Sequence, residues 1–102
     1  MIHVIAIITT KPGQRETVLQ AFRANVPNVH AEQGCIEYTA TIDASPALKF
    51  QTPMGPDTFL VVEKWENTAA LEAHLAAPHM AAYSARTRDL VANRAIHVLT
   101  AA

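Results

Sequence analysis

Four side chains in the second half of the chain have the chemistry of a proton-transfer site: Trp65, His74, His79 and Tyr83. Imidazole titrates near neutral pH and can act as an acid or a base. Because Tyr83 follows His79 by four residues, the two side chains share one face of a continuous helix, and Arg86 extends that line. Trp65 ends the preceding apolar run. The pattern indicates an apolar pocket for a small molecule, with His74, His79 and Tyr83 as candidate catalytic groups and Trp65 and Arg86 as candidate binding groups.

The same side chains are also compatible with purely structural roles. The two histidines would then pack or hydrogen-bond within the helical region, and the tryptophan and tyrosine would be ordinary core residues. A buried indole N–H needs a hydrogen-bond partner, and a ligand oxygen would be one. Two further aromatic candidates for the same pocket are Tyr38 and Phe50.

Metal and nucleotide cofactors are not expected. The chain has five histidines, but His74 and His79 are five residues apart across Pro78, which is not the spacing that brings two imidazoles of one helix to one ion. The three glycines are scattered, so they form neither a dinucleotide fingerprint nor a phosphate-binding loop. No Gly-x-Ser-x-Gly turn is present.

Length and charge restrict the partners. A chain of 102 residues corresponds to one domain, residues 1–102, and eight Lys plus Arg against nine Asp plus Glu give a formal charge of −1. Without a basic stripe, nucleic acid is not expected as a partner. The apolar N-terminus lacks a basic leader and is too short to span a bilayer, so we expect a cytoplasmic protein with no membrane association.

The first half of the chain predicts a strand, a helix and a second strand. Residues 2–9 are rich in Ile and Val and form the first strand. A helix follows Pro12 and runs to about Ala31, with a kink or an early end at Pro27. Gly34 supplies a left-handed stop, and residues 35–43 alternate as a strand, with one face made of Ile36, Tyr38, Ala40 and Ile42. Residues 44–57 form a long connection with a short extended piece at 49–51.

The second half predicts a strand, a helical region and a last strand. Residues 58–66 form a strand with Phe59, Val61, Glu63 and Trp65 on one side. Asn67 caps a helix that is interrupted at Pro78 and continues to about Ala92, and residues 95–100 are the last strand. The order strand, helix, strand, strand, helix, strand predicts an α+β, ferredoxin-like fold with both helical regions on one face of an antiparallel sheet.

The other face of that sheet needs a cover as well. The first and third strands carry apolar residues on both faces, and the chain has no further helix for the second face. We therefore predict a homodimer whose sheets pack face to face. His3 and His97, expected on the outermost strands, are predicted to be surface or dimer-contact residues.

Several segments resemble the antibiotic biosynthesis monooxygenase superfamily: residues 32–38 (EQGCIEY), 65–67 (WEN), 70–75 (ALEAHL) and 78–80 (PHM), together with Tyr83. The likeness runs over nearly the whole chain, and the small bacterial quinol monooxygenases are the most similar group. It implies a dimeric α/β barrel that oxidises a small aromatic substrate with molecular oxygen and no cofactor. In such a site a quinol or polycyclic phenol, deprotonated in a dry pocket, can pass electrons to oxygen directly.

The resemblance leaves alternatives open. A small-metabolite isomerase or a binding protein could use the same cavity, although a phosphate-binding set is not evident beyond Arg86 and Arg88. Haem-degrading relatives use an Asn on the first strand and an iron-ligating His on the second helix. Residues 2–9 contain no Asn, and Tyr83 takes the place of that histidine, so haem degradation is disfavoured.

Overall fold

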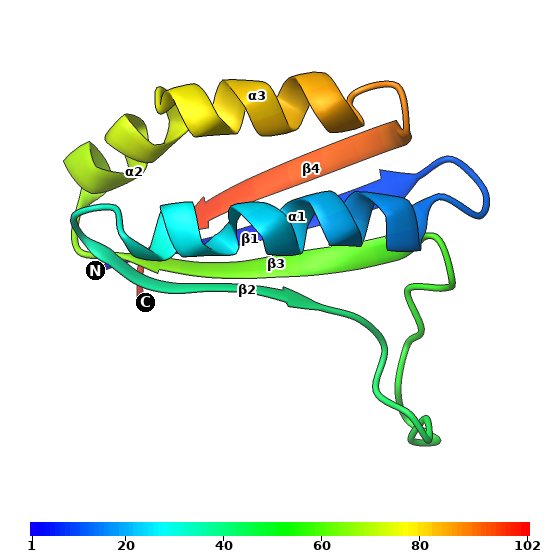
Figure 1. The fold of residues 1–102 in the computed structure, drawn as a ribbon. Coiled ribbons are helices and arrows are strands. Elements are labelled where there is room, and N and C mark those ends of the chain that lie inside the picture. The colour runs from blue at the N-terminus through cyan, green and yellow to red at the C-terminus, as the bar shows by residue number, and fades with distance from the viewer.

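The computed structural model describes residues 1–102 as one four-stranded antiparallel sheet with three helices on one of its faces (Figure 1). The strand order is β2-β3-β1-β4. This is the predicted α+β, ferredoxin-like arrangement. No helix has the length and apolarity needed to cross a membrane. The elements in chain order are β1 (Ile2–Thr10), α1 (Arg15–His30), β2 (Cys35–Thr41), β3 (Thr58–Trp65), α2 (Thr68–Leu75), α3 (Pro78–Thr87) and β4 (Val91–Leu99).

The core lies between the sheet and the helices. β1 pairs with β3 so that Val4 lies opposite Glu63 and Ala6 opposite Val61, which puts alternate residues of both strands under the helices. α1 adds an apolar face to this core, including Val18 and Phe22. Phe22 stacks on Tyr38 with ring centroids 4.9 Å apart. The sheet therefore supplies a floor, and the helices supply the walls of any site on this side.

The second helical region is two helices rather than one interrupted helix. Asn67 caps α2 as predicted, since its Oδ1 accepts a hydrogen bond from the Ala70 N–H at 2.9 Å. α2 ends at Leu75, and Pro78 then opens α3 as a first-turn residue, where its missing N–H costs nothing. α3 ends at Thr87 and not near Ala92, because residues from Val91 onward pair with β1 and extend β4.

Several local predictions were wrong. β1 is a central strand, so His3 is not on an outermost strand, although His97 lies on the edge strand β4. A register shift after Cys35 removes Ile36 from the inward alternation and leaves it 53% exposed, while Tyr38 remains buried.

Residues 49–51 form a turn instead of an extended piece, with the Gln51 N–H donating to the Leu48 carbonyl. α1 also passes through Pro27 and ends at His30.

Gly34 joins α1 to β2 at a very close approach to α2. Its φ is +84°, and a Cβ at this position would lie 2.6 Å from the Cβ of Ala70. We expect Gly34→Ala to lower the free energy of unfolding by about 2 kcal/mol or more, because backbone strain and a steric clash add. Gly13→Ala is the matched control: its φ is +78° but no atom lies within 4 Å. Equal losses in the free energy of unfolding of the two variants, measured by urea unfolding, would show that the contact with α2 does not contribute to stability.

Candidate functional site

The end of β3 places an indole and a carboxylate side by side under the helices. Trp65 is completely buried, and its Nε1–H donates to Glu63 Oε1 at 3.0 Å. Glu63 is itself only 7% exposed. The expected partner of this indole N–H was a ligand oxygen. The structure assigns that role to Glu63, so Trp65 is a core residue that lines neither of the cavities at Tyr83 and is not free to donate to a ligand.

α2 places His74 against the indole of Trp65. The imidazole lies against the Trp65 ring with centroids 4.6 Å apart, and it meets the Tyr38 ring edge-on at 5.4 Å. Only 2% of the His74 side chain is exposed. Its Nδ1 lies 2.7 Å from Oε2 of Glu32, in the turn between α1 and β2. His74 is therefore packed among aromatic rings and can act on a ligand only through its neighbours.

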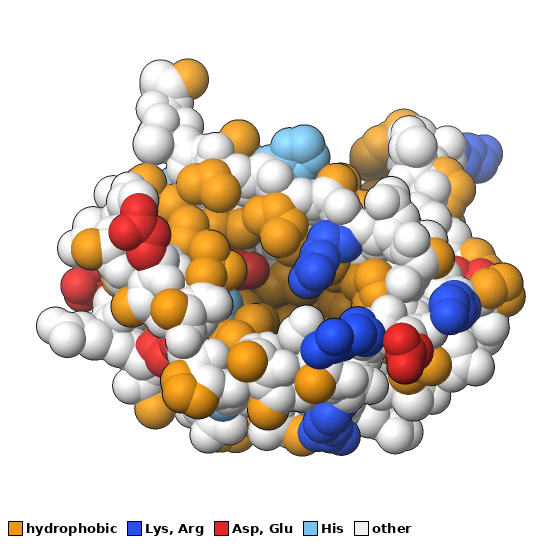
Figure 2. Space-filling view, turned by 90° about the horizontal axis from the view of Figure 1, so that it is seen from above, with side chains coloured by type: hydrophobic (Ala, Val, Ile, Leu, Met, Phe, Trp, Pro, Cys, Tyr) orange, Lys and Arg blue, Asp and Glu red, His pale blue; other side chains and the backbone are white.

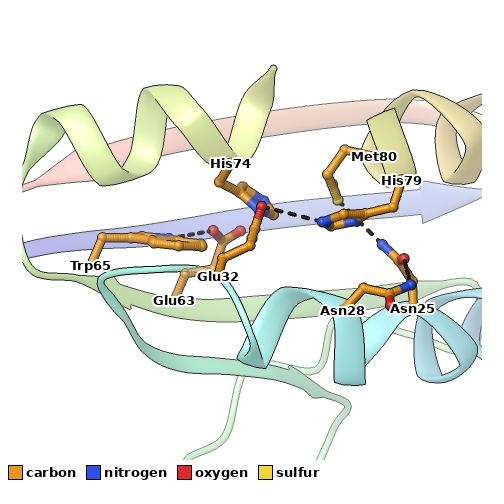
Figure 3. A network of polar contacts seen from close by, with 8 residues as sticks. All are labelled: Asn25, Asn28, Glu32, Glu63, Trp65, His74, His79 and Met80. Carbon is orange, nitrogen blue, oxygen red and sulfur yellow. Dashed lines mark hydrogen bonds and ion pairs between the residues drawn. The ribbon is translucent and has the colours of Figure 1, made fainter. Parts of the chain in front are cut away.

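Glu32 holds the second imidazole with its other oxygen. His79, in the first turn of α3, places Nε2 at 3.2 Å from Glu32 Oε1, so one carboxylate bridges the two histidines (Figure 3). A carboxylate can only accept hydrogen bonds. Each contacting ring nitrogen therefore carries the proton, at Nδ1 in His74 and at Nε2 in His79.

The remaining nitrogen of His79 has no partner. Nδ1 of His79 is the one buried side-chain nitrogen or oxygen atom of the chain without a hydrogen bond. With the proton held on Nε2 by Glu32, Nδ1 of the neutral ring carries a free lone pair. Buried polar atoms are nearly always hydrogen-bonded, so an unpaired one calls for an explanation such as a catalytic role. This atom is the best-placed base in the molecule.

His79 borders a cavity of about 210 Å³ between α1 and α3. Tyr83, one turn further along α3, and Arg86, nearly one turn beyond it, line the same space. Asn25 and Asn28 of α1 supply amides on the opposite side, where Asn28 Nδ2 donates to Asn25 Oδ1 at 3.0 Å. The cavity combines a base, a phenol, a guanidinium and amides.

Tyr83 also borders a second cavity, of about 280 Å³, on the β4 side of α3. Burial raises the pKa of the Tyr83 phenol, and the positive charge of Arg94 opposes this rise. The phenol therefore keeps its proton at neutral pH and can donate a hydrogen bond. Seen from the helix side, the surface is hollowed, with hydrophobic side chains on the floor and Lys and Arg side chains along the rim (Figure 2).

The structure divides the predicted site residues: His79, Tyr83 and Arg86 line one cavity, whereas His74 and Trp65 are packed in the core. His74, His79 and Trp65 meet around two carboxylates, and Tyr38 touches the group as a core residue. Phe50 lies apart: it is 85% exposed in the connection between β2 and β3, which leaves the sheet on the side away from the helices (Figure 1). A cavity of about 390 Å³ lies along α1 and β2; Tyr38 lines it, but none of the candidate catalytic residues does.

Sequence reasoning missed both carboxylates. Glu63 alternates with apolar residues on the inward side of β3, and a charge on such a face was a usable signal of a buried polar contact. Glu32 had no local signal, because it lies in a turn 42 positions from His74 and 47 from His79. No group of three or more His, Cys, Asp or Glu side chains is arranged to hold a metal ion.

Glu63 makes stability depend on pH in a predictable direction. Burial raises its pKa above the ordinary 4.5, while the Trp65 N–H and His74 lower it and Glu32 raises it further. The folded state therefore binds a proton more tightly than the unfolded state, and stability falls as the pH rises from about 4.5 through the raised pKa. We expect Glu63→Gln, which keeps an acceptor for the indole, to flatten this fall in thermal unfolding scans.

The matched control is Glu37→Gln, at a carboxylate that forms a partly exposed pair with Lys64 at 3.1 Å. This variant should keep the fall in stability. A Glu63→Gln protein that loses stability in parallel with the unmodified chain between acid and neutral pH would contradict the assignment.

Comparisons with known proteins agree with this architecture. The model of the family described as "Antibiotic biosynthesis monooxygenase" matches residues 1–86. A protein of Escherichia coli (strain K12) named "Probable quinol monooxygenase YgiN" is 44% identical over 101 residues, which cover 97% of this chain and 96% of that protein.

Solved structures show the same fold. PA3566 from Pseudomonas aeruginosa superimposes with a TM-score of 0.82 at 30% identity and covers 99% of this chain and 93% of its own. Rv0793 from Mycobacterium tuberculosis has a TM-score of 0.79 at 22% identity over 99% of this chain and 94% of its own, and supports the fold alone. With a family match over most of its length and a relative at 44% identity, the chain belongs to the antibiotic biosynthesis monooxygenase family.

Proposed function

We propose that this protein is a monooxygenase that oxidises a quinol or polycyclic phenol with molecular oxygen, and that His79 is its base. The observation that carries the proposal is the buried, unpartnered Nδ1 of His79 beside a cavity, with the opposite nitrogen held by Glu32. The name of the relative from E. coli supports the substrate class.

The first step of the reaction is proton removal. Nδ1 of His79 takes the proton of a substrate hydroxyl, and the Glu32 carboxylate stabilises the imidazolium that results. Tyr83 and Arg86, on the same cavity, hold and orient the oxygen atoms of the substrate. His74, which is closed off from solvent, serves as a positioning residue that fixes Glu32 through the 2.7 Å contact.

The second step is electron transfer from the substrate to oxygen. The quinolate is electron-rich and passes electrons to O₂ within the cavity, after which the two combine at a ring carbon. One oxygen atom stays on the ring, giving a hydroxyquinone, and the other leaves as water with the two hydrogens that the quinol loses. The substrate supplies all the electrons, so no external reductant is required. The protein contributes the base, the orientation and the exclusion of water.

Oxygen uptake tests the proposal. Purified protein is mixed with menadiol in air-saturated buffer, and oxygen consumption is compared with the spontaneous rate and with an anaerobic control. We expect saturable acceleration together with a hydroxylated quinone that carries label from ¹⁸O₂. Binding of menadiol without acceleration would reject the monooxygenase and leave a binding protein of the same fold.

We also propose that two copies associate through the sheet face that has no helix. Ile5, Ile7, Leu60 and Val62 form two cross-strand pairs at the centre of that face, Ile5 with Val62 and Ile7 with Leu60. An apolar sheet face on a small domain is usually covered. We expect Val62→Lys to convert the dimer to a monomer of 11.1 kDa in light scattering. Ala24→Lys, at an exposed position on α1, should leave the dimer intact.

A further inference from the structure

The cavity on the β4 side of α3 differs in its chemistry from the cavity at His79. It has a volume of about 280 Å³, and its lining combines apolar and basic side chains with no carboxylate: Ile8, Tyr83, Ser84, Thr87, Arg88, Val91, Ala92, Asn93 and Arg94. The Thr87 hydroxyl is occupied, since it donates to the Tyr83 carbonyl at 3.0 Å. The two guanidinium groups, the Ser84 hydroxyl and the Asn93 amide remain as donors.

Neither arginine of this cavity is neutralised. Arg88 and Arg94 form no ion pair, whereas Arg23 on α1 is bound to Glu16 at 2.8 Å. Against the rise that burial causes, the positive charge of Arg94 lowers the pKa of the Tyr83 phenol, which lines both cavities. Two exposed guanidiniums that have no carboxylate partner and border one cavity can offer charge-assisted hydrogen bonds to an anion.

The sheet beneath the arginines is apolar. Arg94 lies opposite Ile8 in the β1–β4 ladder, and the next two residues of β4 on the same face, Ile96 and Val98, are 52% and 56% exposed. A planar ring could lie on this surface while a substituent reaches the guanidiniums.

We infer that this second cavity binds the anionic substituent, a carboxylate or a phosphate, of a planar aromatic ligand. The inference rests on the proposed function, because Tyr83 lines both cavities and would lie between this anchor and the base. Among the quinols and phenols of the proposed function, it predicts that those carrying a negatively charged substituent bind more tightly than neutral ones such as menadiol.

Anaerobic calorimetric titration tests the inference without turnover. The three probes are 1-hydroxy-2-naphthoate, 1-naphthyl phosphate and the neutral 2-methyl-1-naphthol. We expect at least one anionic probe to bind about tenfold or more tightly than the neutral one, and Arg94→Gln or Arg88→Gln to remove most of that advantage. The stronger of the two anionic probes identifies the substituent.

Arg23→Gln is the control, because Arg23 is exposed, paired with Glu16 and remote from the cavity. It should leave the affinity of all three probes unchanged. Equal affinity of the anionic and neutral probes would overturn the inference, as would an anionic preference that survives in the Arg88→Gln/Arg94→Gln double variant. Since no oxidation occurs, these outcomes do not depend on whether menadiol is a substrate.

Discussion

Replacing His79 by Gln should lower kcat for menadiol oxidation by about 100-fold or more, which is the range that a positioned general base contributes. Gln keeps a polar side chain that can reach Glu32 but has no nitrogen that takes up a proton. His79 is partly exposed and lies in the first turn of α3, so the fold should survive. Steady-state oxygen uptake gives kcat, and circular dichroism checks the fold.

The matched control is His97→Gln, because His97 is an exposed histidine on β4 and lines neither of the cavities at Tyr83. It should retain full activity. A His79→Gln protein with an undiminished kcat would remove His79 as the base and redirect the proposal to another proton acceptor at the cavity.

Glu32→Gln should lower kcat at least about tenfold with a smaller effect on KM, because the substrate does not contact Glu32 while the base depends on it. The amide oxygen of Gln can accept only part of the two hydrogen bonds that the carboxylate now accepts at 2.7 and 3.2 Å. The amide NH₂ can also face His79 and favour the wrong tautomer. Single-turnover kinetics and the ¹⁵N resonances of the His79 ring report these two effects separately.

Glu37→Gln is a suitable comparison, since it removes a carboxylate from the surface of β2 rather than from the site. It should affect neither measurement. If Glu32→Gln changed stability alone and left both the ring resonances and kcat in place, Glu32 would be only a structural link between the elements.

Much of the fold could be predicted because local rules and tertiary contacts agree in most segments. The apolar runs at residues 2–9 and 58–66 are strands with buried alternate residues, and Asn67 caps a helix as its residue type suggests. The errors lie where pairing decides the structure. Residues 91–94 have no strand-like sequence, yet they extend β4 because β1 offers hydrogen-bond partners over that length. The displacement of Ile36 likewise depends on the register with β3.

The candidate site was also predictable only where local sequence determines it. The imidazoles, the phenol and the indole could be selected by residue type and by spacing within one stretch of chain, from Trp65 to Tyr83. Their acidic partners could not, because the α1–β2 turn reaches the helices only through the tertiary fold. Phe50 was selected for its aromatic ring alone, and no spacing argument tied it to the helices. Arg94 was missed because the last strand was predicted to begin at residue 95, whereas β4 begins at Val91.

The bridging carboxylate has a consequence for how this chain can change by substitution. With both oxygens of Glu32 engaged by separate rings from α2 and α3, the worth of any one of the three side chains depends on the other two. The losses caused by the single replacements should therefore add up to more than the loss caused by replacing all three side chains together, and the three residues should be kept or lost together. A related sequence that lacks one of the two histidines should therefore also lack an acidic residue at the position of Glu32.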